Sequence, residues 1–536
     1  MWLSFLIFFP IFAGLFLLFF SSSNHQKIFS TLTIVVTSLE LFLCSILYFI
    51  FSPKNYLQFV EKTEWITLSL GNFGHLSIDY FVALDGLSLV MIWLSAFVMW
   101  IGALVSWQIK TQIKGYYSLY LILTGTVIGC FVAWDFFLFY LFFEFMLLPM
   151  FFLIGIWGGE KREYASMKFF IYTLVGSLLI LVVIIVLHLS MVDIEKTSEK
   201  LKIGERELIN NIEKNQIEKQ DFVRSFNIRL MMDKKSFITQ ETTKSIKDKK
   251  IKNKTDTISW RVWAFWLLVI GFLIKLPSVP FHTWLPDAHV EAPTPVSVVL
   301  AGILLKVGGY GIYRFGFGIF PEIAIEYSTT LATIGIISII YGAMNALAME
   351  DLKKMVAYSS VSHMGFVLLG FASHTQEGVA GAIFQMVSHG ILSAMLFVLV
   401  GILYVRTHDR NINHYQGLSQ KMPFYTSFVL IGFFASLGLP VFSGFIGELF
   451  TLLGTFKAQK LGIIYTFLGI IGIVLGAGYF LWTLQRMFFG TFWVKDNTIE
   501  IDTLEDLYIS EWFILLVLSF LTLLLGVMPS LVFDKL

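Results

Sequence analysis

The sequence predicts an all-α polytopic membrane protein with about 14 transmembrane helices. Of its 536 residues, 57% are hydrophobic and only 14% are charged, and the mean hydropathy is +0.76; soluble proteins of this length are far more polar. Apolar windows of about 20 residues, the length of a helix that spans a bilayer, recur along the chain. Two of these windows contain prolines near polar residues, so we expect interrupted helices within the membrane.

The predicted helices follow one another closely, except across one long polar gap. They occupy residues 2–20, 28–51, 85–107, 113–133, 136–157, 165–189, 260–285, 294–318, 324–348, 355–373, 378–404, 424–455, 461–488 and 510–533. An even number of spans places both termini on one side. Lysine and arginine are more numerous in the short loops after odd-numbered helices, so these loops are predicted on the negative side of the membrane and both termini on the positive side.

The polar gap at residues 191–258 is rich in lysine and acidic residues and has no apolar run. Its composition is typical of a solvated, partly disordered insertion. The alternative is a docking segment for a neighbouring subunit. The predicted topology places it on the positive side.

A charged residue stands at the first predicted interruption. Lys275 lies in the apolar run that starts near Trp260, and Pro277 and Pro280 follow it. A charge at the bilayer centre costs roughly 2.5–3.5 kcal/mol. Irregular backbone at that depth survives only where it is buried in protein or lines a wet cavity. We therefore predict a transport site here.

Five more ionisable residues fall inside predicted helices: Glu144, Lys306, His363, His389 and Glu448. Gln385, His389 and Ser393 share one helix face, because they are four residues apart. Ser359 and His363 repeat this spacing. Such rows can hold a file of water molecules.

A purely structural role competes with this interpretation. Each histidine alone can be a packing residue, and Glu144 with Lys275 can form an ion pair that only holds helices together. Such a pair leaves Lys306 and Glu448 unexplained. Two acids and two lysines without partners would cost on the order of 10 kcal/mol. We favour a buried path for protons or ions, because a lysine whose partner moves can take up and release a proton.

The two interrupted windows resemble each other. Leu276-Pro277 and Leu439-Pro440 both lie in long apolar segments, with the prolines 163 positions and five helices apart. Because five is odd, the second segment crosses the membrane in the opposite sense, which indicates an inverted repeat with a binding site between its halves.

Other patterns carry weaker signals. Asp287, His289 and Glu291 could suggest a metal, but in a proline-rich loop we expect them to order the loop or take up protons. Cys44 and Cys130 lie in apolar runs without disulfide or metal spacing. The net charge of +1 gives no basic surface for nucleic acid. The sequence has no nucleotide, haem or iron–sulfur motif, so we expect no cofactor bound by this chain.

The segment from Phe281 to Gly311, FHTWLPDAHVEAPTPVSVVLAGILLKVGGYG, resembles the signature of the antiporter-like membrane subunits of respiratory complex I, NADH:ubiquinone oxidoreductase, of the mitochondrial type. The resemblance covers nearly the whole chain. It implies two inverted five-helix repeats, discontinuous seventh and twelfth helices, and a proton path. The implied path consists of Glu144, Lys275, Lys306 and Glu448, with His363 and His389 between them. Sister subunits of the family typically carry lysine in place of Glu448, and the family joins helices six and seven by a loop much shorter than 191–258.

The resemblance also implies a division of the chain. The predicted parts are residues 1–110 (helices 1–3), 111–320 (first repeat, helices 4–8), 321–490 (second repeat, helices 9–13) and 491–536 (helix 14).

As function, the resemblance implies a proton-translocating subunit of NADH:ubiquinone reductase with no catalytic chemistry of its own. NADH, FMN, iron–sulfur clusters and ubiquinone would bind elsewhere in the complex, and their redox chemistry would drive the protons. The implied partners are other membrane-arm subunits, including neighbouring antiporter-like ones, and lipid. Two alternatives are a cation/proton antiporter subunit outside respiration and a structural membrane spacer.

The chain starts directly in a hydrophobic helix, without a targeting segment. We therefore expect a bacterial protein or one made inside an organelle. With the mitochondrial resemblance, the prediction is an organelle-encoded, multi-pass protein of the mitochondrial inner membrane, with both termini on the intermembrane-space side.

Overall fold

The computed structural model describes residues 1–20, 26–214, 216–233, 236, 255–495 and 504–536. Within these ranges, eleven helices are long and apolar enough to cross a membrane. The three other predicted windows hold the short helix α1 (Trp2–Leu17) and two interrupted helices. The multi-pass helical fold is therefore confirmed, whereas the count of fourteen spans stays a prediction.

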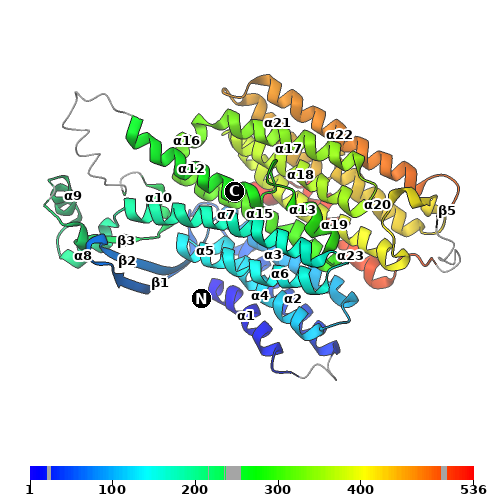
Figure 1. Cartoon of the computed structure of the whole chain (residues 1–536), viewed down its shortest axis with the longest axis horizontal. Coiled ribbons are helices and arrows are strands. Elements are labelled where there is room, and N and C mark those ends of the chain that lie inside the picture. The colour runs from blue at the N-terminus through cyan, green and yellow to red at the C-terminus, as the bar shows by residue number, and fades with distance from the viewer. Residues whose placement is uncertain (21–25, 215, 234–235, 237–254, 496–503) are drawn as a thin grey trace.

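The remaining elements follow in chain order (Figure 1). The helices are α2 (Gln26–Ile50), α3 (Gly86–Val105), α4 (Ile113–Val132), α5 (Phe136–Phe145), α6 (Leu147–Trp157), α7 (Arg162–Ser190), α8 (Ile194–Leu201), α9 (Glu205–Glu213), α10 (Ile228–Met232), α12 (Thr255–Lys275), α13 (Trp284–Glu291), α14 (Thr294–Val299), α15 (Leu305–Gly311), α16 (Pro321–Glu326), α17 (Ser328–Ala348), α18 (Leu352–Ala372), α19 (Gln376–Thr407), α20 (Pro423–Ser436), α21 (Ser443–Lys457), α22 (Gly462–Phe488), α23 (Ile509–Val527) and α24 (Ser530–Phe533). The strands are β1 (Gln58–Ser69), β2 (His75–Leu84), β3 (Val223–Ser225), β4 (Tyr415–Gln416) and β5 (Trp493–Val494).

The helices differ in how deeply they are buried. The apolar window of α19 is 100% buried, whereas that of α22 is only 22% buried. Helix α19 packs against α3, α18, α21 and α23. A polar side chain on α19 is therefore enclosed by protein, and one on the outer face of α22 would meet lipid.

Both predicted interruptions are present. Helix α12 ends at Lys275 before α13, and α20 ends at Ser436 before α21. The same three backbone hydrogen bonds recur 161 positions apart: Leu276 to Phe272, Ser278 to Leu273 and Phe281 to Ser278 in the first, and Leu437 to Phe433, Leu439 to Phe434 and Phe442 to Leu439 in the second. Equivalent backbone positions are thus 161 residues apart, whereas the sequence match of the two prolines implied 163. The proline match therefore aligned the wrong positions. The backbone hydrogen bonds place Gly438, not Pro440, opposite Pro277.

A second matched pair lies at helix starts. Asp135 caps α5 by accepting from the second and third backbone N–H groups after it, and Asp351 caps α18 in the same way. Each aspartate also pairs with an asparagine of a later loop, Asn227 or Asn411. These two sets of contacts agree with the predicted repeats, although the boundaries of the repeats stay a prediction.

A small sheet at one end of the helices was missed by the search for apolar windows (Figure 1). Strands β1 and β2 form a hairpin, and β3 of the insertion adds to β2 in parallel. The fold is mostly helical, as predicted, with this small sheet added at one end. The Met1 amino group pairs with Glu61 of β1 (3.0 Å), and Lys535 bonds to the carbonyl of Phe51 just before the hairpin. Both termini thus lie at the sheet end of the bundle, while their side of the membrane stays a prediction.

The insertion is folded where the structure describes it, so the partly disordered interpretation is wrong for residues 191–214 and 216–233. Lys196 of α8 donates to Ser77 Oγ and Asp79 Oδ1 of β2, both at 2.7 Å. Burial alone would lower the pKa of Lys196, but the bond to Asp79 outweighs it and raises the pKa above its usual value. This ammonium is therefore charged at neutral pH. Residues 237–254 of the insertion lie outside the described residues.

Candidate functional site

Four of the six predicted site residues form one buried row, called here the central row: Lys306, His389, His363 and Glu448. Lys306 Nζ lies 2.7 Å from His389 Nδ1. The ring centres of His389 and His363 are 5.6 Å apart, and His363 Nδ1 lies 3.3 Å from Glu448 Oε1. Helices α15, α19, α18 and α21 each contribute one member, so the row crosses the interior from α15 to α21.

The backbone around Lys306 is adapted to its side chain. Residues Leu300–Leu304 and Ile312–Phe317 on either side of α15 are π-helical. π-Helical turns are rare in proteins, and those that occur are often at functional sites. Lys306 Nζ uses this local geometry to donate to the Ala301 carbonyl, five residues earlier, at 2.6 Å. The bond to Ala301 holds the Lys306 amino group in place, 2.7 Å from His389 Nδ1.

The two histidines border a small cavity of about 10 Å³. It is lined by the polar side chains that the sequence spacing had grouped, Ser359, Gln385 and Ser393, together with Ser360 and Ser436. About 10–15 Å³ is the space that one water molecule requires when several polar groups surround it. A water here would bridge the gap between the two imidazole rings.

The Glu448 carboxylate packs closely against Gly438, a glycine at the second interruption. A Cβ atom on Gly438 would lie 2.6 Å from Glu448 Oε2, and Gly438 has φ of +79°, which favours glycine. We expect Gly438→Ala to displace the carboxylate from His363 and to slow proton pumping. Gly478→Ala on α22 is the matched control, because a Cβ there meets nothing within 4 Å. Equal pumping by both variants would contradict this role of Gly438.

Lys275 and Glu144 are not joined as predicted. The described residues contain no ion pair between them: Lys275 Nζ has no hydrogen-bond partner, and neither has Glu144 Oε1. The ammonium instead faces the rings of Phe143 and Phe169, with centroids at 5.2 and 5.4 Å. Cation–π contacts attract a desolvated cation but do not neutralise it. The Lys275 ammonium is therefore buried, with only 1% of the residue's surface accessible, and has no hydrogen-bonded acid beside it among the described residues.

Glu144 lies at a break of its own. Helices α5 and α6 meet at Met146, where the sequence analysis expected one continuous helix. Pro149 has no N–H to bond the Phe145 carbonyl, so the helix ladder is interrupted beside Glu144. Glu144 and Lys275 thus each lie beside an interruption of the helical hydrogen bonding.

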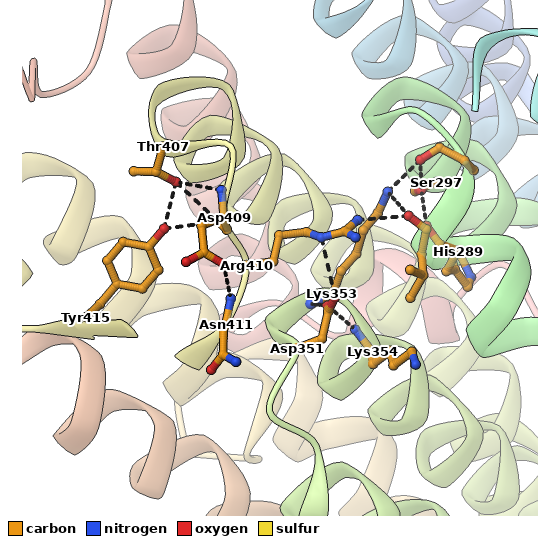
Figure 2. A network of polar contacts seen from close by, with 12 residues as sticks. His289, Ser297, Asp351, Lys353, Lys354, Thr407, Asp409, Arg410, Asn411 and Tyr415 are labelled. Carbon is orange, nitrogen blue, oxygen red and sulfur yellow. Dashed lines mark hydrogen bonds and ion pairs between the residues drawn. The ribbon is translucent and has the colours of Figure 1, made fainter. Parts of the chain in front are cut away.

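A cavity of about 1160 Å³ opens at the end of the bundle opposite to the sheet. Lys353 Nζ donates to the Ala292 carbonyl (2.5 Å), and Arg410 donates to the Val290 carbonyl (2.9 Å). Figure 2 shows these side chains reaching toward the end of α13, which carries His289, and the start of α14, which carries Ser297. The charged residues of the cavity thus tie together the loops after α13, α17 and α19.

The three residues that could suggest a metal do not converge. Asp287 pairs with Lys168 at 2.6 Å, and Glu291 accepts from the backbone N–H of Lys161 at 2.9 Å. His289 points inward, is fully buried and stacks on Phe397 with centroids 4.5 Å apart. Neither ring nitrogen of His289 has a partner within the described residues. All three residues lie on helix α13, so the prediction of a loop here is wrong. Asp287 and Glu291 hold this helix to the start and first turns of α7, while His289 lies between the cavity and the core.

Sequence reasoning missed a buried ion pair. Arg314, inside the predicted helix 294–318, donates two hydrogen bonds to Asp85 at 2.5 and 2.7 Å and lies over the Trp134 ring. Asp85 also caps α3 through the Ser88 N–H. The only signal in the sequence was one arginine and one aspartate at the edges of apolar runs, 229 positions apart. Glu40 on α2, a buried acid within an apolar run, was also not predicted from the sequence.

Comparison with known proteins identifies the family of this chain. The pattern that describes the "NADH:quinone oxidoreductase/Mrp antiporter, TM" family matches residues 133–218 and 228–476. The chain belongs to this family. The matched residues include the central row, Lys275 and Glu144.

Relatives extend over almost the full chain. NADH-quinone oxidoreductase subunit M of Rickettsia bellii (strain RML369-C) is 37% identical over 534 residues, 98% of this chain and 95% of that protein. NADH-ubiquinone oxidoreductase chain 4 of Chondrus crispus is 34% identical over 521 residues, 96% and 92% of the two chains. A chain in the structure "Respiratory complex I from Thermus thermophilus with bound NADH" is 27% identical, with a TM-score of 0.77 over 99% of this chain and 97% of that one.

The same fold occurs in an antiporter. A chain of the Mrp complex from Dietzia sp. DQ12-45-1b superimposes with a TM-score of 0.76 at 19% identity, over 99% of this chain and 95% of that one. At this identity the similarity concerns the fold alone.

Proposed function

We propose that this chain is a proton-translocating membrane subunit of NADH:quinone oxidoreductase. The observation that carries the proposal is the central row, in which Lys306, two histidines and Glu448 follow one another inside the protein. Ionisable residues in membrane helices are expensive and are retained mainly for transport or proton relay. The names of the relatives, subunit M and chain 4, support the assignment to this enzyme.

The contacts of the central row define how a proton moves along it. Lys306 breaks one N–H bond as neutral His389 gains the proton at Nδ1, across 2.7 Å. His389 then releases the proton from Nε2, and the cavity water passes it toward His363. Glu448 receives it at Oε1, 3.3 Å from His363 Nδ1. Each imidazole ends this transfer as the other neutral tautomer, because the proton enters at one ring nitrogen and leaves from the other. A ring flip, or a proton exchange through the cavity water, restores the first tautomer before the next transfer.

Lys275 supplies the coupling to the rest of the complex in this proposal. Without a partner its ammonium is costly, and an approach of Glu144 would stabilise the charge. A shift of the interrupted helices that closes or opens this pair would therefore load or release a proton. Helix α15 would move with this segment, because the two backbones are in close contact at Gly308. A Cβ there would lie only 2.5 Å from the Leu276 backbone nitrogen.

Proton uptake is assigned to the large cavity and His289. The imidazole lies within electrostatic reach of both Lys353, which borders the cavity, and Lys306. It is the group through which a proton from the cavity would reach the central row. NADH, FMN, iron–sulfur clusters and ubiquinone are assigned to other subunits, with the neighbouring membrane-arm subunits and lipid as the surroundings of this chain.

We expect Lys275→Ala to abolish NADH-driven proton pumping in vesicles, because the switch loses its charge. Lys110→Ala, which removes an exposed lysine of a loop, is the control for loss of positive charge alone. Full proton-coupled turnover in an assembled Lys275→Ala enzyme would contradict the proposal.

A cation/proton antiporter subunit outside respiration is the second candidate, favoured by the Mrp part of the family description and by the shared fold. Purification of the complex separates the two. Copurification with an NADH-oxidising flavin and iron–sulfur assembly supports the first, whereas sodium–proton exchange in vesicles without NADH supports the second.

For location, we propose the mitochondrial inner membrane, an organelle-encoded gene and both termini in the intermembrane space. The high phenylalanine content, 55 residues, supports an AT-rich organelle genome. Relatives such as the Rickettsia bellii protein are bacterial. Cell fractionation, with protease protection of tagged termini, decides between an organelle and a bacterial plasma membrane.

A further inference from the structure

We propose that Glu40 of α2 is a proton-binding site separate from the central row, and that it keeps its proton at neutral pH while the enzyme turns over. Glu40 is fully buried, and neither carboxyl oxygen has a hydrogen-bond partner among the described residues. It lies outside the residues that match the family pattern.

The polar neighbours of Glu40 on α2 do not stabilise a negative charge. Thr33 and Thr37 share its buried face but donate their hydroxyl hydrogens to the carbonyls of Phe29 and Thr33. One turn later lies Cys44, a buried free thiol, which is only a weak donor. The face thus offers no charge-assisted hydrogen bond to a carboxylate.

Within the described residues, no cation of the helices packed against α2 pairs with Glu40 either. These are α1, α3 and α4, and α1 and α3 contain no charged residue. The lysine of α4, Lys114, is in its first turn. At the other end of α2, Lys535 is bonded to the Phe51 carbonyl beside Asp534.

The remaining titratable groups of α4 are already engaged. Tyr116 bonds to Ser106 Oγ, Tyr117 donates to the Ser106 carbonyl, and Tyr120 donates to the Met99 carbonyl. Cys130 lies near the far end of α4 and is directed to the Phe139 carbonyl.

A carboxylate at position 40 would therefore be an unpaired charge in an apolar interior, which is far more costly than a neutral acid. Glu40 is also separated from proton traffic. The cavity of the central row is lined by residues of α18, α19, α20 and α21, none of α2. The site binds a proton and nothing larger, because its oxygens are completely enclosed.

Infrared difference spectroscopy of the purified complex tests the protonation directly. The spectrum of wild type minus Glu40→Gln should contain the C=O stretch of one protonated acid at every pH from mildly acidic to mildly alkaline, and no carboxylate bands. Glu199→Gln, on the exposed surface of α8, is the control and should remove carboxylate bands instead. Carboxylate bands in the Glu40 difference spectrum would overturn the proposal.

Two further measurements complete the test. Glu40→Asp keeps the acid, so its protonated band should persist at a shifted frequency; loss of that band in favour of carboxylate bands contradicts the proposal. Glu40→Gln should pump protons at the wild-type rate in the assembled complex, and a loss of pumping would show that the Glu40 proton moves. The spectroscopic result is independent of the proposed function, so failure of one is distinguishable from failure of the other.

Discussion

Lys306→Met is expected to stop NADH-driven proton pumping almost completely. Methionine fills the space of the lysine stem but can neither donate to the Ala301 carbonyl and His389 nor carry a proton. A positioned acid–base group contributes roughly 100-fold or more to a proton-transfer step, so we expect pumping to fall by a factor on the order of 100. The measurement is acidification of vesicles that contain the assembled complex.

A second substitution at this position separates proton transfer from structure. Lys306→Arg keeps a charge and its hydrogen bonds, but arginine does not release its proton at physiological pH. Pumping should therefore fail in Lys306→Arg as well. Lys457→Met, at a partly exposed pair with Glu377, is the matched control and should pump normally. Normal pumping by Lys306→Met or Lys306→Arg would favour the structural spacer over a proton path.

Arg314→Met is expected to cause the largest loss of stability. It leaves the Asp85 carboxylate buried without its cation, and breaking a buried pair from one side costs roughly 3–5 kcal/mol. The exposed fractions of the two side chains are only 6% and 12%, so solvent cannot replace the lost partner. The midpoint temperature of unfolding of the solubilised complex should fall accordingly.

The double variant Asp85→Asn/Arg314→Met provides the control for Arg314. Asparagine keeps an oxygen to accept the Ser88 N–H at the start of α3 but removes the unpaired charge. It should recover most of the stability that Arg314→Met loses. A double variant as unstable as the single one would show that the pair acts through shape rather than charge.

Sequence and structure agree where the governing physics is local. An apolar run in a membrane must satisfy its own backbone hydrogen bonds, so the runs became helices. Proline lacks a backbone donor, so the runs at Pro277 and Pro440 are interrupted. The row of Gln385, His389 and Ser393 lines one cavity because residues four apart share a helix face.

Which distant side chains pair with each other does not follow from local sequence. Glu144 was considered as an ion-pair partner of Lys275, but Lys275 faces two phenylalanine rings. Neither Lys275 Nζ nor Glu144 Oε1 has a hydrogen-bond partner among the described residues. Conversely, Lys306 with His389 and Asp85 with Arg314 join residues of different helices. Which faces of two helices meet depends on their rotation and on close glycine contacts, and these are properties of packing.

By itself, the sequence determined the membrane class, the positions of the helices and both interruptions, and it named every member of the central row. Only the tertiary structure decided that Lys306, His389, His363 and Glu448 follow one another in that order and that β3 of the insertion joins the hairpin. It also decided that the Glu40 carboxyl has no hydrogen-bond partner among the described residues. The reason is physical: desolvation of the backbone acts within each segment, whereas the partner of a buried charge is chosen between segments, after the helices have packed.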